Sequence, residues 1–341
     1  MKKKVIIVGW GNISRQAHRI IRDASDMEVV AIASRRPEGV REEFPTKPSF
    51  MILGIQDPTL LEMSADAVIL GGGSKADLPV TAPWAVSQLP VKVLVDSFDT
   101  HGKISNHIDR ATNLPALGYH HQLNLLARGT EKTHLLGQGW DPGFFSMMRT
   151  LFESFLPGSK AYTLYGLGER GGLSMGHSDA CRKVDGVLDA RSYTHAKVDA
   201  IESIRRGFNP ILEPGAMHWR ENFIVAKDGA NIKMIEATIK TMPDYFADYD
   251  TVVHFISKDD MIKHHQKMLH NGLVIAVKDD DILELKLRFE DNPRGTAGIL
   301  VSAVRAGLQM HDQGRFGAFL PQEVPPSAFW AGDFMSLIKK T

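Results

Sequence analysis

The chain has a single cysteine, no excess of either charge and no long apolar run. Cys181 alone can form neither an internal disulfide nor a cysteine-based metal cluster, which fits a reducing compartment. The 40 basic and 40 acidic side chains balance, so no net charge favours nucleic acid or an anionic membrane as a partner. No apolar stretch reaches the ~20 residues that span a bilayer. The stretch that follows Lys4 stops at Gly9, too early for a signal peptide, so we expect a cytoplasmic protein.

The length and composition are those of a globular protein with two domains. The chain has 341 residues, of which 43% are hydrophobic and 23% charged. These values allow a packed core. In the first third, expected apolar strands alternate with helical stretches such as 16–22; the strands are at 5–8, 29–33, 67–70 and 91–95. Continuous apolar strands separated by helices favour a doubly wound parallel sheet.

The pattern changes after about residue 145. Residues 273–289 read as an apolar run, a polar turn and a stretch that alternates apolar with charged side chains. This pattern is typical of an antiparallel hairpin with one face in water. We expect 223–226 and 252–256 to be its neighbouring strands, and the spacing of isoleucines over 232–239 predicts an amphipathic helix between them.

The expected fold is therefore α/β. An N-terminal Rossmann-like, doubly wound parallel sheet is followed by an α+β domain with an open, mostly antiparallel sheet. A final helix at 298–311 is assigned to the first domain, so the expected domains are 1–139 with 293–341, and 140–292.

A glycine-rich turn follows the first expected strand, in the order Gly9, Trp10, Gly11, Asn12, Ile13, Ser14. Gly9 permits the tight turn, and Gly11 lets the backbone approach a pyrophosphate at the N-terminus of the next helix. Ser14 stands where the usual motif has a third glycine, so the helix can lie slightly farther from the strand. An ordinary glycine turn is the alternative, but strand, turn and helix together favour a dinucleotide site.

The end of the second expected strand indicates which dinucleotide binds. An NAD enzyme places a carboxylate there for the ribose 2′-hydroxyl, whereas this chain has Ser34, Arg35 and Arg36. A hydroxyl and two guanidinium groups can bind a 2′-phosphate, so we expect NADP rather than NAD. A basic surface loop is the alternative. The glycine-rich segment 71–74, at the end of another expected strand, adds moderate support; its alternative is a flexible loop.

Several segments together resemble the meso-diaminopimelate D-dehydrogenase family. They occur in family order over nearly the whole chain, at 9–14, 33–38, 71–79, 96–101, 139–149, 173–180, 241–246, 270–272 and 290–293. The combination of GWDPG, GHSDA and TMPDYF is far more specific than the glycine motif alone. The resemblance implies a Rossmann NADP domain and a second domain for substrate binding and dimerisation, hence a homodimer. The implied reaction is reversible oxidative deamination of the D-centre of meso-2,6-diaminopimelate to L-2-amino-6-oxopimelate and ammonia.

The family's acidic residues around the reacting amine match Asp99 and Asp141. A carboxylate can hold the amine, help it lose a proton and stabilise the iminium that hydride loss leaves. From spacing alone, each aspartate could equally be a helix cap or turn residue, and Asp141 does precede Pro142 and Gly143.

The resemblance also assigns the substrate and cofactor contacts. Arg220 matches the arginine that binds the distal carboxylate. The other substrate residues implied are Trp140, Tyr165, Met175, Gly176, Thr194, His270 and Asn292. Besides the glycine turn and the serine–arginine triplet, the implied cofactor contacts are Gly72, Gly73, Ser74, Ser97, Phe98, Pro142, Gly143 and Phe144. Without the resemblance, a surface ion pair for Arg220 and a hydrogen-bonded loop position for His270 would be the simpler interpretations.

Two departures from the family bear on the substrate. Tyr165 stands where the family usually has tryptophan, and the stretches 166–172 and 101–139 are longer than usual. A dehydrogenase that acts on a broader range of D-amino acids, a simpler D-amino acid or a 2-oxo acid is therefore the second hypothesis, and an NADPH-binding sensor without activity is the third.

The histidine pairs at 120–121 and 264–265 are adjacent in sequence and lack an acidic partner at metal-site spacing, so no metal site is expected.

Overall fold

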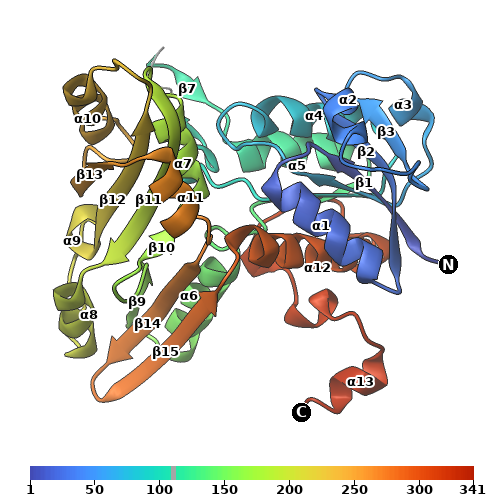
Figure 1. The fold of residues 1–341 in the computed structure, drawn as a ribbon. Helices are drawn as coiled ribbons and strands as arrows, with labels where there is room; N and C mark the ends of the chain where they lie inside the picture. Colours follow the sequence, from blue (N-terminus) through green and yellow to red (C-terminus); the bar gives the residue numbers. More distant parts are fainter. Residues whose placement is uncertain (109–112) are drawn as a thin grey trace. The chain divides into compact units, whose positions relative to one another are not determined.

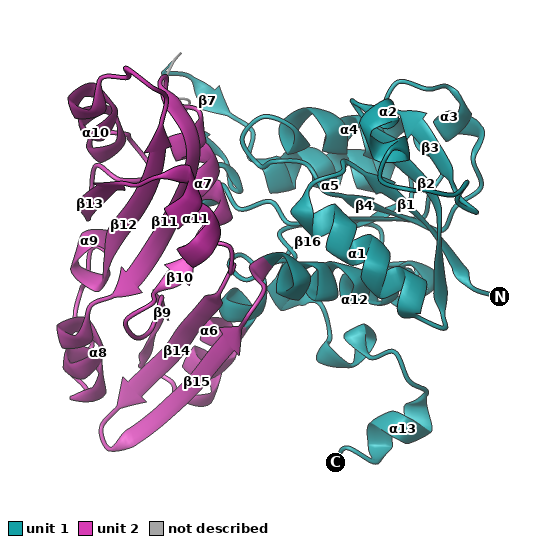
Figure 2. Ribbon diagram, viewed as in Figure 1, with its two compact units in different colours: residues 1–147, 293–341 teal, residues 148–292 magenta. Residues whose placement is uncertain are grey.

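The computed structural model describes residues 1–108 and 113–341, which divide into two compact units (Figures 1 and 2). Unit 1 comprises Met1–Met147 and Pro293–Thr341, and unit 2 comprises Met148–Asn292. Residues 140–147, which the sequence assigned to the second domain, thus lie in unit 1. The turn that leads into them is tied to the sheet of unit 1, because the Gln138 N–H donates to the Asp96 carbonyl at 2.7 Å.

Unit 1 contains a seven-stranded sheet in the order β16-β8-β5-β4-β1-β2-β3, in which every pair is parallel. Its strands are β1 (Lys3–Val8), β2 (Met27–Ser34), β3 (Met51–Gly54), β4 (Ala67–Leu70), β5 (Val93–Asp96), β8 (Thr133–Leu135) and β16 (Gly317–Phe319). The parallel sheet is as predicted. The strands β3, β8 and β16 were not predicted from the sequence. A separate pair joins β6 (His107–Ile108) to β7 (Pro115–Ala116).

Helices cover both faces of this sheet, so the domain is doubly wound (Figure 1). Unit 1 contains the helices α1 (Asn12–Asp23), α2 (Pro37–Arg41), α3 (Thr59–Glu62), α4 (Leu78–Gln88), α5 (Tyr119–Gly129), α12 (Asn292–Asp312) and α13 (Phe334–Ile338), of which α13 has no buried residue. Helices α1 and α12 share one core cluster through Ile21 and Val304, and α4 and α5 share another through Ala82 and Leu123. The helix predicted at 298–311 is therefore part of the first domain's core.

Unit 2 contains two sheets, where the sequence indicated one. The first has the order β10 (Gly172–Leu173), β11 (Val187–Ala196), β12 (His218–Ala226), β13 (Asp250–Phe255), and the second has the order β15 (Asp281–Phe289), β14 (His270–Lys278), β9 (Lys160–Tyr165). The hairpin β14–β15 is confirmed. The neighbours predicted for it, 223–226 and 252–256, are wrong, since they pair in parallel as β12 and β13 in the other sheet. Strand β14 is buried along most of its length, and β9 pairs with its second edge.

The helices of unit 2 complete its cores. They are α6 (Phe144–Phe155), which begins in unit 1, α7 (Met175–Arg182), α8 (Val198–Arg205), α9 (Pro214–Met217), α10 (Ile232–Lys240) and α11 (Lys258–His264). The predicted amphipathic helix is α10, with Ile235 and Ile239 buried beside Ile224. No helix within 1–108 or 113–341 has the length and apolar character to cross a membrane.

Candidate functional site

The glycine turn after β1 is shaped for close backbone contacts. Gly9 has φ +93°, and a Cβ there would lie 3.1 Å from the carbonyl carbon of Gly71. Gly11 is the N-cap of α1, and a Cβ there would meet no atom within 4 Å, so the space in front of it is open. Ser14 is fully buried, and its Oγ would lie 2.0 Å from a Cβ at position 71. Gly71 thus provides the room that the missing third glycine would have provided, and the open helix N-terminus is suited to an anion.

The end of β2 carries a hydroxyl and arginines but no acid, as the sequence indicated. Ser34 is buried and its Oγ accepts the Arg36 N–H at 3.1 Å. The Arg35 side chain is 76% exposed and pairs with Asp77 at 3.2 Å. Asp77 also accepts the Gly73 N–H at 3.0 Å, so one carboxylate fixes the glycine-rich loop and holds Arg35 beside it. Asp77 was not predicted as a site residue from the sequence, although it lies within the family-like segment 71–79.

The two candidate catalytic aspartates lie on neighbouring loops at the carboxyl edge of the unit 1 sheet. Asp99 is exposed and its N–H donates to Ser74 Oγ at 3.0 Å. The His101 ring Nε2 donates to the Asp141 carbonyl at 3.2 Å. One hydrogen bond thus joins Asp99 to Ser74, and another joins His101, two residues after Asp99, to Asp141. These contacts bring the three segments together, as a common site requires.

The remaining predicted residues of unit 1 differ in what they can present. The Phe98 side chain is 1% exposed and stacks on Tyr119, so it offers a ligand its backbone rather than its ring. Pro142 and Gly143 are buried, and a Cβ on Gly143 would lie 1.7 Å from the Gly139 carbonyl oxygen. This close approach explains a glycine there. Of the other predicted site residues in unit 1, Trp140 is buried. The ones that are at least partly exposed are Asn12, Ile13, Gly72, Gly73, Ser74, Ser97 and Phe144.

Arg220 of unit 2 is a buried cation. It is 7% exposed, donates to Thr194 Oγ1 on the paired strand β11, and its guanidinium carbon lies 4.0 Å from the centre of the Tyr249 ring. Burial lowers the pKa of Arg220, although an arginine stays charged at physiological pH. Within the described parts of the chain no carboxylate pairs with it, and its Nε has no hydrogen-bond partner. A buried charge without a counter-ion is costly, so this site is suited to receiving an anionic ligand.

Two histidines beside this region, the buried His218 and the half-buried His270, are neutral near pH 7. Burial lowers the pKa of His270 to about 4 and, together with the nearby Arg220 charge, lowers the pKa of His218 to about 3. His270 can therefore offer a hydrogen bond, whereas the sequence analysis also allowed a charge. The Asn292 amide donates to the Leu173 carbonyl at 3.1 Å and lies 3.3 Å from His270 Nδ1.

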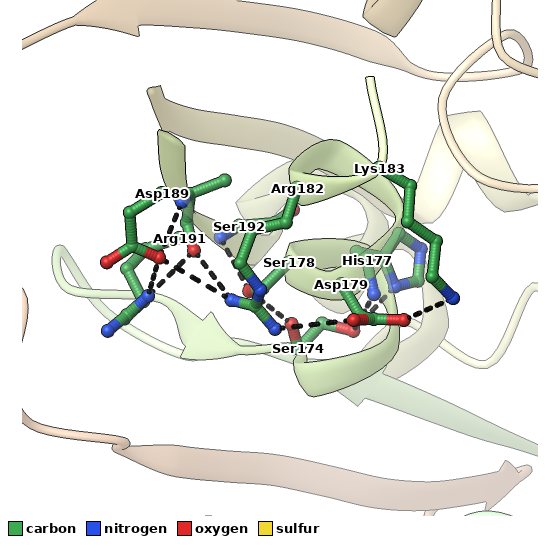
Figure 3. Close-up of polar contacts among 10 residues, drawn as sticks. Ser174, His177, Ser178, Asp179, Arg182, Lys183, Asp189, Arg191 and Ser192 are labelled. Carbon is green, nitrogen blue, oxygen red and sulfur yellow. Dashed lines mark hydrogen bonds and ion pairs between the residues drawn. The ribbon is translucent and has the colours of Figure 1, made fainter. Parts of the chain in front are cut away.

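The first turn of α7 is held in place by serines (Figure 3). Ser174 is the N-cap; its N–H donates to the Ser192 carbonyl, and its own carbonyl accepts from Ser178 Oγ at 2.6 Å. Gly176, in that turn, is exposed, and a Cβ there would meet no atom within 4 Å. Met175 and Gly176 therefore present accessible backbone in the first turn of α7.

Strand β10 joins these residues into one region of unit 2. Its Gly172 pairs with Thr194, and the Leu173 N–H donates to the Leu269 carbonyl, directly before His270. Thus the structure gathers Thr194, Arg220, His270, Asn292 and the α7 N-terminus around β10.

Tyr165 and the long segment after it border the same region. The Tyr165 N–H donates to His218 Nε2 at 2.9 Å, and the two rings stack at 5.4 Å. The side chain of Asn271 bonds to the N–H and carbonyl of Leu167 and to the carbonyl of Gly171. Asn271 therefore fixes the segment 166–172, a role not predicted from the sequence although Asn271 follows His270 in a family-like triplet.

Within 1–108 and 113–341, no three His, Cys, Asp or Glu side chains are placed to hold a metal ion.

Known proteins resemble this chain over nearly its whole length. Residues 139–290 match the family described as the diaminopimelic acid dehydrogenase C-terminal domain. A meso-diaminopimelate D-dehydrogenase of Acetivibrio thermocellus is 36% identical over 334 residues, which cover 96% of this chain and 93% of that protein. The C. glutamicum DAP dehydrogenase in complex with DAP has a TM-score of 0.85 and 32% identity, over 99% of each chain. An engineered D-amino acid dehydrogenase bound to NADP⁺ has a TM-score of 0.83 and 31% identity, over 100% of this chain and 99% of that one. The chain belongs to the meso-diaminopimelate D-dehydrogenase family.

Proposed function

We propose that this protein catalyses the reversible, NADP-dependent oxidative deamination of the D-centre of meso-2,6-diaminopimelate. The products are L-2-amino-6-oxopimelate and ammonia. The observation that carries the proposal is Arg220, a buried cation that has no carboxylate partner in the described chain and lies among hydrogen-bonding side chains. A substrate with a second carboxylate, distant from the reacting carbon, supplies the missing counter-ion.

The cofactor residues fit NADP. Gly9 and Gly11 admit the pyrophosphate to the α1 N-terminus, and Ser34, Arg35 and Arg36 hold the 2′-phosphate, which an acid at the end of β2 would repel. The Arg35 guanidinium exchanges Asp77 for this phosphate or binds both. NADP⁺, when bound, accepts the hydride from the substrate carbon.

The aspartates of unit 1 act on the reacting amine. An ammonium group gives up a hydride poorly, because the carbon is left with positive charge. Asp99 and Asp141 are proposed to hold the amine, accept a proton from it and stabilise the iminium by charge. Water then attacks the iminium carbon, and ammonia leaves.

The residues of unit 2 recognise the rest of the substrate. Arg220 and Thr194 bind the distal carboxylate, and a neutral His270 adds a hydrogen bond. Asn292 holds the distal amino acid, and the backbone of Met175 and Gly176 receives the carboxylate of the D-centre. Trp140 and Tyr165 are further proposed substrate contacts. A cytoplasmic homodimer is proposed in the same way, from family membership.

A simpler D-amino acid is the second candidate substrate. The observation that favours it is Tyr165, whose backbone is held by His218 and whose phenol replaces the tryptophan usual in the family. A smaller ring with a hydroxyl changes the shape and polarity of the D-side.

A substrate panel at alkaline pH distinguishes these functions. With NADP⁺ and NADPH absorbance as the signal, turnover restricted to meso-diaminopimelate supports the first proposal. Comparable turnover of D-alanine and other short D-amino acids supports the second candidate. NADPH binding without turnover on any member of the panel contradicts both and leaves a cofactor sensor.

A further inference from the structure

Asp96, at the end of β5, is a fully buried carboxylate that receives four hydrogen bonds. Its Oδ1 accepts the backbone N–H groups of Phe98 and Gly137, each at 2.9 Å. Its Oδ2 accepts from the Tyr119 hydroxyl and from His134 Nε2, each at 2.8 Å. All five residues belong to unit 1.

The hydrogen bonds keep this carboxylate ionised. Burial raises the pKa of Asp96, but the bonds from His134, Gly137 and Phe98 outweigh burial, so that the pKa is lowered overall. Hydrogen bonds to a charged acceptor are about twice as strong as neutral ones, so the two backbone groups are held firmly.

The two backbone donors belong to the two loops that carry the aspartates proposed for the chemistry. Phe98 is followed directly by Asp99, and its ring stacks on Tyr119 with the centroids 3.9 Å apart. Gly137 starts the turn that leads to Asp141, and the Gln138 N–H donates to the Asp96 carbonyl at 2.7 Å. One carboxylate thus fixes the backbone of both loops within a few residues of Asp99 and Asp141.

We propose that Asp96 is a positioning residue for the deamination, because a single buried charge sets the location of both catalytic loops. The inference rests on the roles proposed for Asp99 and Asp141. Tyr119 and His134 support it by binding the second carboxylate oxygen, which prevents the group from rotating. Small displacements of reacting groups cost much rate, and about 1 Å can cost 10²-fold.

Asp96→Asn tests the proposal. The amide keeps one oxygen but is neutral, and its NH₂ faces the donors of Tyr119 and His134 or those of the two loops. We expect kcat with meso-diaminopimelate to fall by about 10²-fold. The Kd for NADP⁺, measured by titration without turnover, should rise less, by no more than about 10-fold, because the glycine turn and β2 are untouched and only the implied contacts at Ser97 and Phe98 are disturbed. A purely structural role would lower kcat and raise this Kd to a similar extent.

Asp26→Asn is the matched control. Asp26 accepts a forked pair of bonds from Arg305 at 2.7 and 3.0 Å in the same unit, just before the amino end of β2. Its loss should lower the melting temperature without lowering kcat. The same 10²-fold loss of kcat in this control would overturn the proposal, because any lost carboxylate in unit 1 would then suffice.

A double-variant cycle separates the inference from the proposed function. Groups that act as a unit are non-additive, so in an Asp99→Asn background the loss from Asp96→Asn should shrink to below about 10-fold. If the losses in kcat of the two single variants are fully additive, the inference is overturned. It is also overturned if Asp96→Asn has the wild-type kcat while Asp99→Asn is impaired. Wild-type kcat in both Asp99→Asn and Asp141→Asn contradicts the roles proposed for those aspartates, however Asp96→Asn behaves.

If Asp96→Asn does not fold, Tyr119→Phe carries the test. It removes one hydroxyl donor from Asp96 and keeps the ring that stacks on Phe98. We expect kcat to fall by about 5-fold with unchanged NADP⁺ affinity. An unchanged kcat in a folded Tyr119→Phe variant overturns the proposal in that case.

Discussion

Replacing Arg220 by methionine tests the substrate assignment and the energetics of a buried charge together. Arg220 is almost fully buried, and the side chains that bond to its guanidinium or stack on it, Thr194 and Tyr249, are neutral. A methionine has a roughly similar volume and removes the charge. The change therefore affects the free protein and the substrate complex in opposite directions.

For the substrate complex, the loss is that of a forked, charge-assisted contact to a carboxylate. Hydrogen bonds to charged groups contribute roughly 1.5–3 kcal/mol net, which corresponds to about 10–150-fold in kcat/KM. A short D-amino acid has no distal carboxylate and should lose little. The ratio of kcat/KM for meso-diaminopimelate to that for D-alanine should fall by the same factor of about 10–150.

For the free protein, the same substitution removes a buried cation that lacks a counter-ion. Replacing buried ionic groups by apolar side chains of similar volume is often neutral or stabilising. We therefore expect the free energy of unfolding, measured in urea without substrate, to be unchanged or higher in Arg220→Met.

Arg205→Met is the matched control, because Arg205 in the same unit is partly exposed and forks onto Glu284. It should leave the substrate ratio unchanged. An unchanged ratio in Arg220→Met would show that Arg220 does not bind the distal carboxylate, and the broad D-amino acid function would then be favoured. A large loss of stability without substrate would contradict the interpretation of Arg220 as a charge awaiting a ligand.

Three further predictions follow from the two units. Arg35→Ala with Arg36→Ala should raise KM for NADP⁺ and leave KM for NAD⁺ nearly unchanged in steady-state assays, because only the 2′-phosphate loses its contacts; equal losses would contradict the assignment. Asp141→Asn should lower kcat by ~10²–10⁴-fold while NADPH binding, followed by fluorescence, changes little; a wild-type kcat would exclude Asp141 from the chemistry. The lowered pKa values of His218 and His270, about 3 and about 4 because of burial, predict acid sensitivity. As the pH falls below about 6.5, the two histidines are protonated in the unfolded state but stay neutral in the folded state. The free energy of unfolding therefore falls until the pH reaches the pKa values of the folded state. His270 alone accounts for a loss of about 2–3 kcal/mol in the free energy of unfolding by pH 4.5. In His270→Gln, the free energy of unfolding measured in urea should therefore differ less between pH 7 and pH 4.5 than in the wild type; an unaltered difference would refute this.

The sequence by itself determined the parallel sheet and the glycine turn, and it predicted NADP as the cofactor. These features depend on short-range patterns: apolar runs buried on both faces, a glycine at φ +93°, and a strand that ends in Ser34 and Arg35 rather than an acid. The family-specific segments extended the sequence prediction to Asp99, Asp141 and Arg220. They could not show whether Arg220 has an acidic neighbour, because burial and counter-ions come from residues far apart along the chain.

Only the tertiary structure decided which strands pair and which polar groups share a partner. The strands at 223–226 and 252–256 pair with each other, because sheet neighbours depend on long-range packing that no local period records. Asp77 reaches Arg35 across 42 residues of chain, and the Asp96 carboxylate binds Gly137 across 41 residues. An aspartate after a strand looks the same in sequence whether it caps a turn, binds an amine or anchors two loops; the fold distinguishes these roles, because only the fold brings the hydrogen-bond donors to its oxygens.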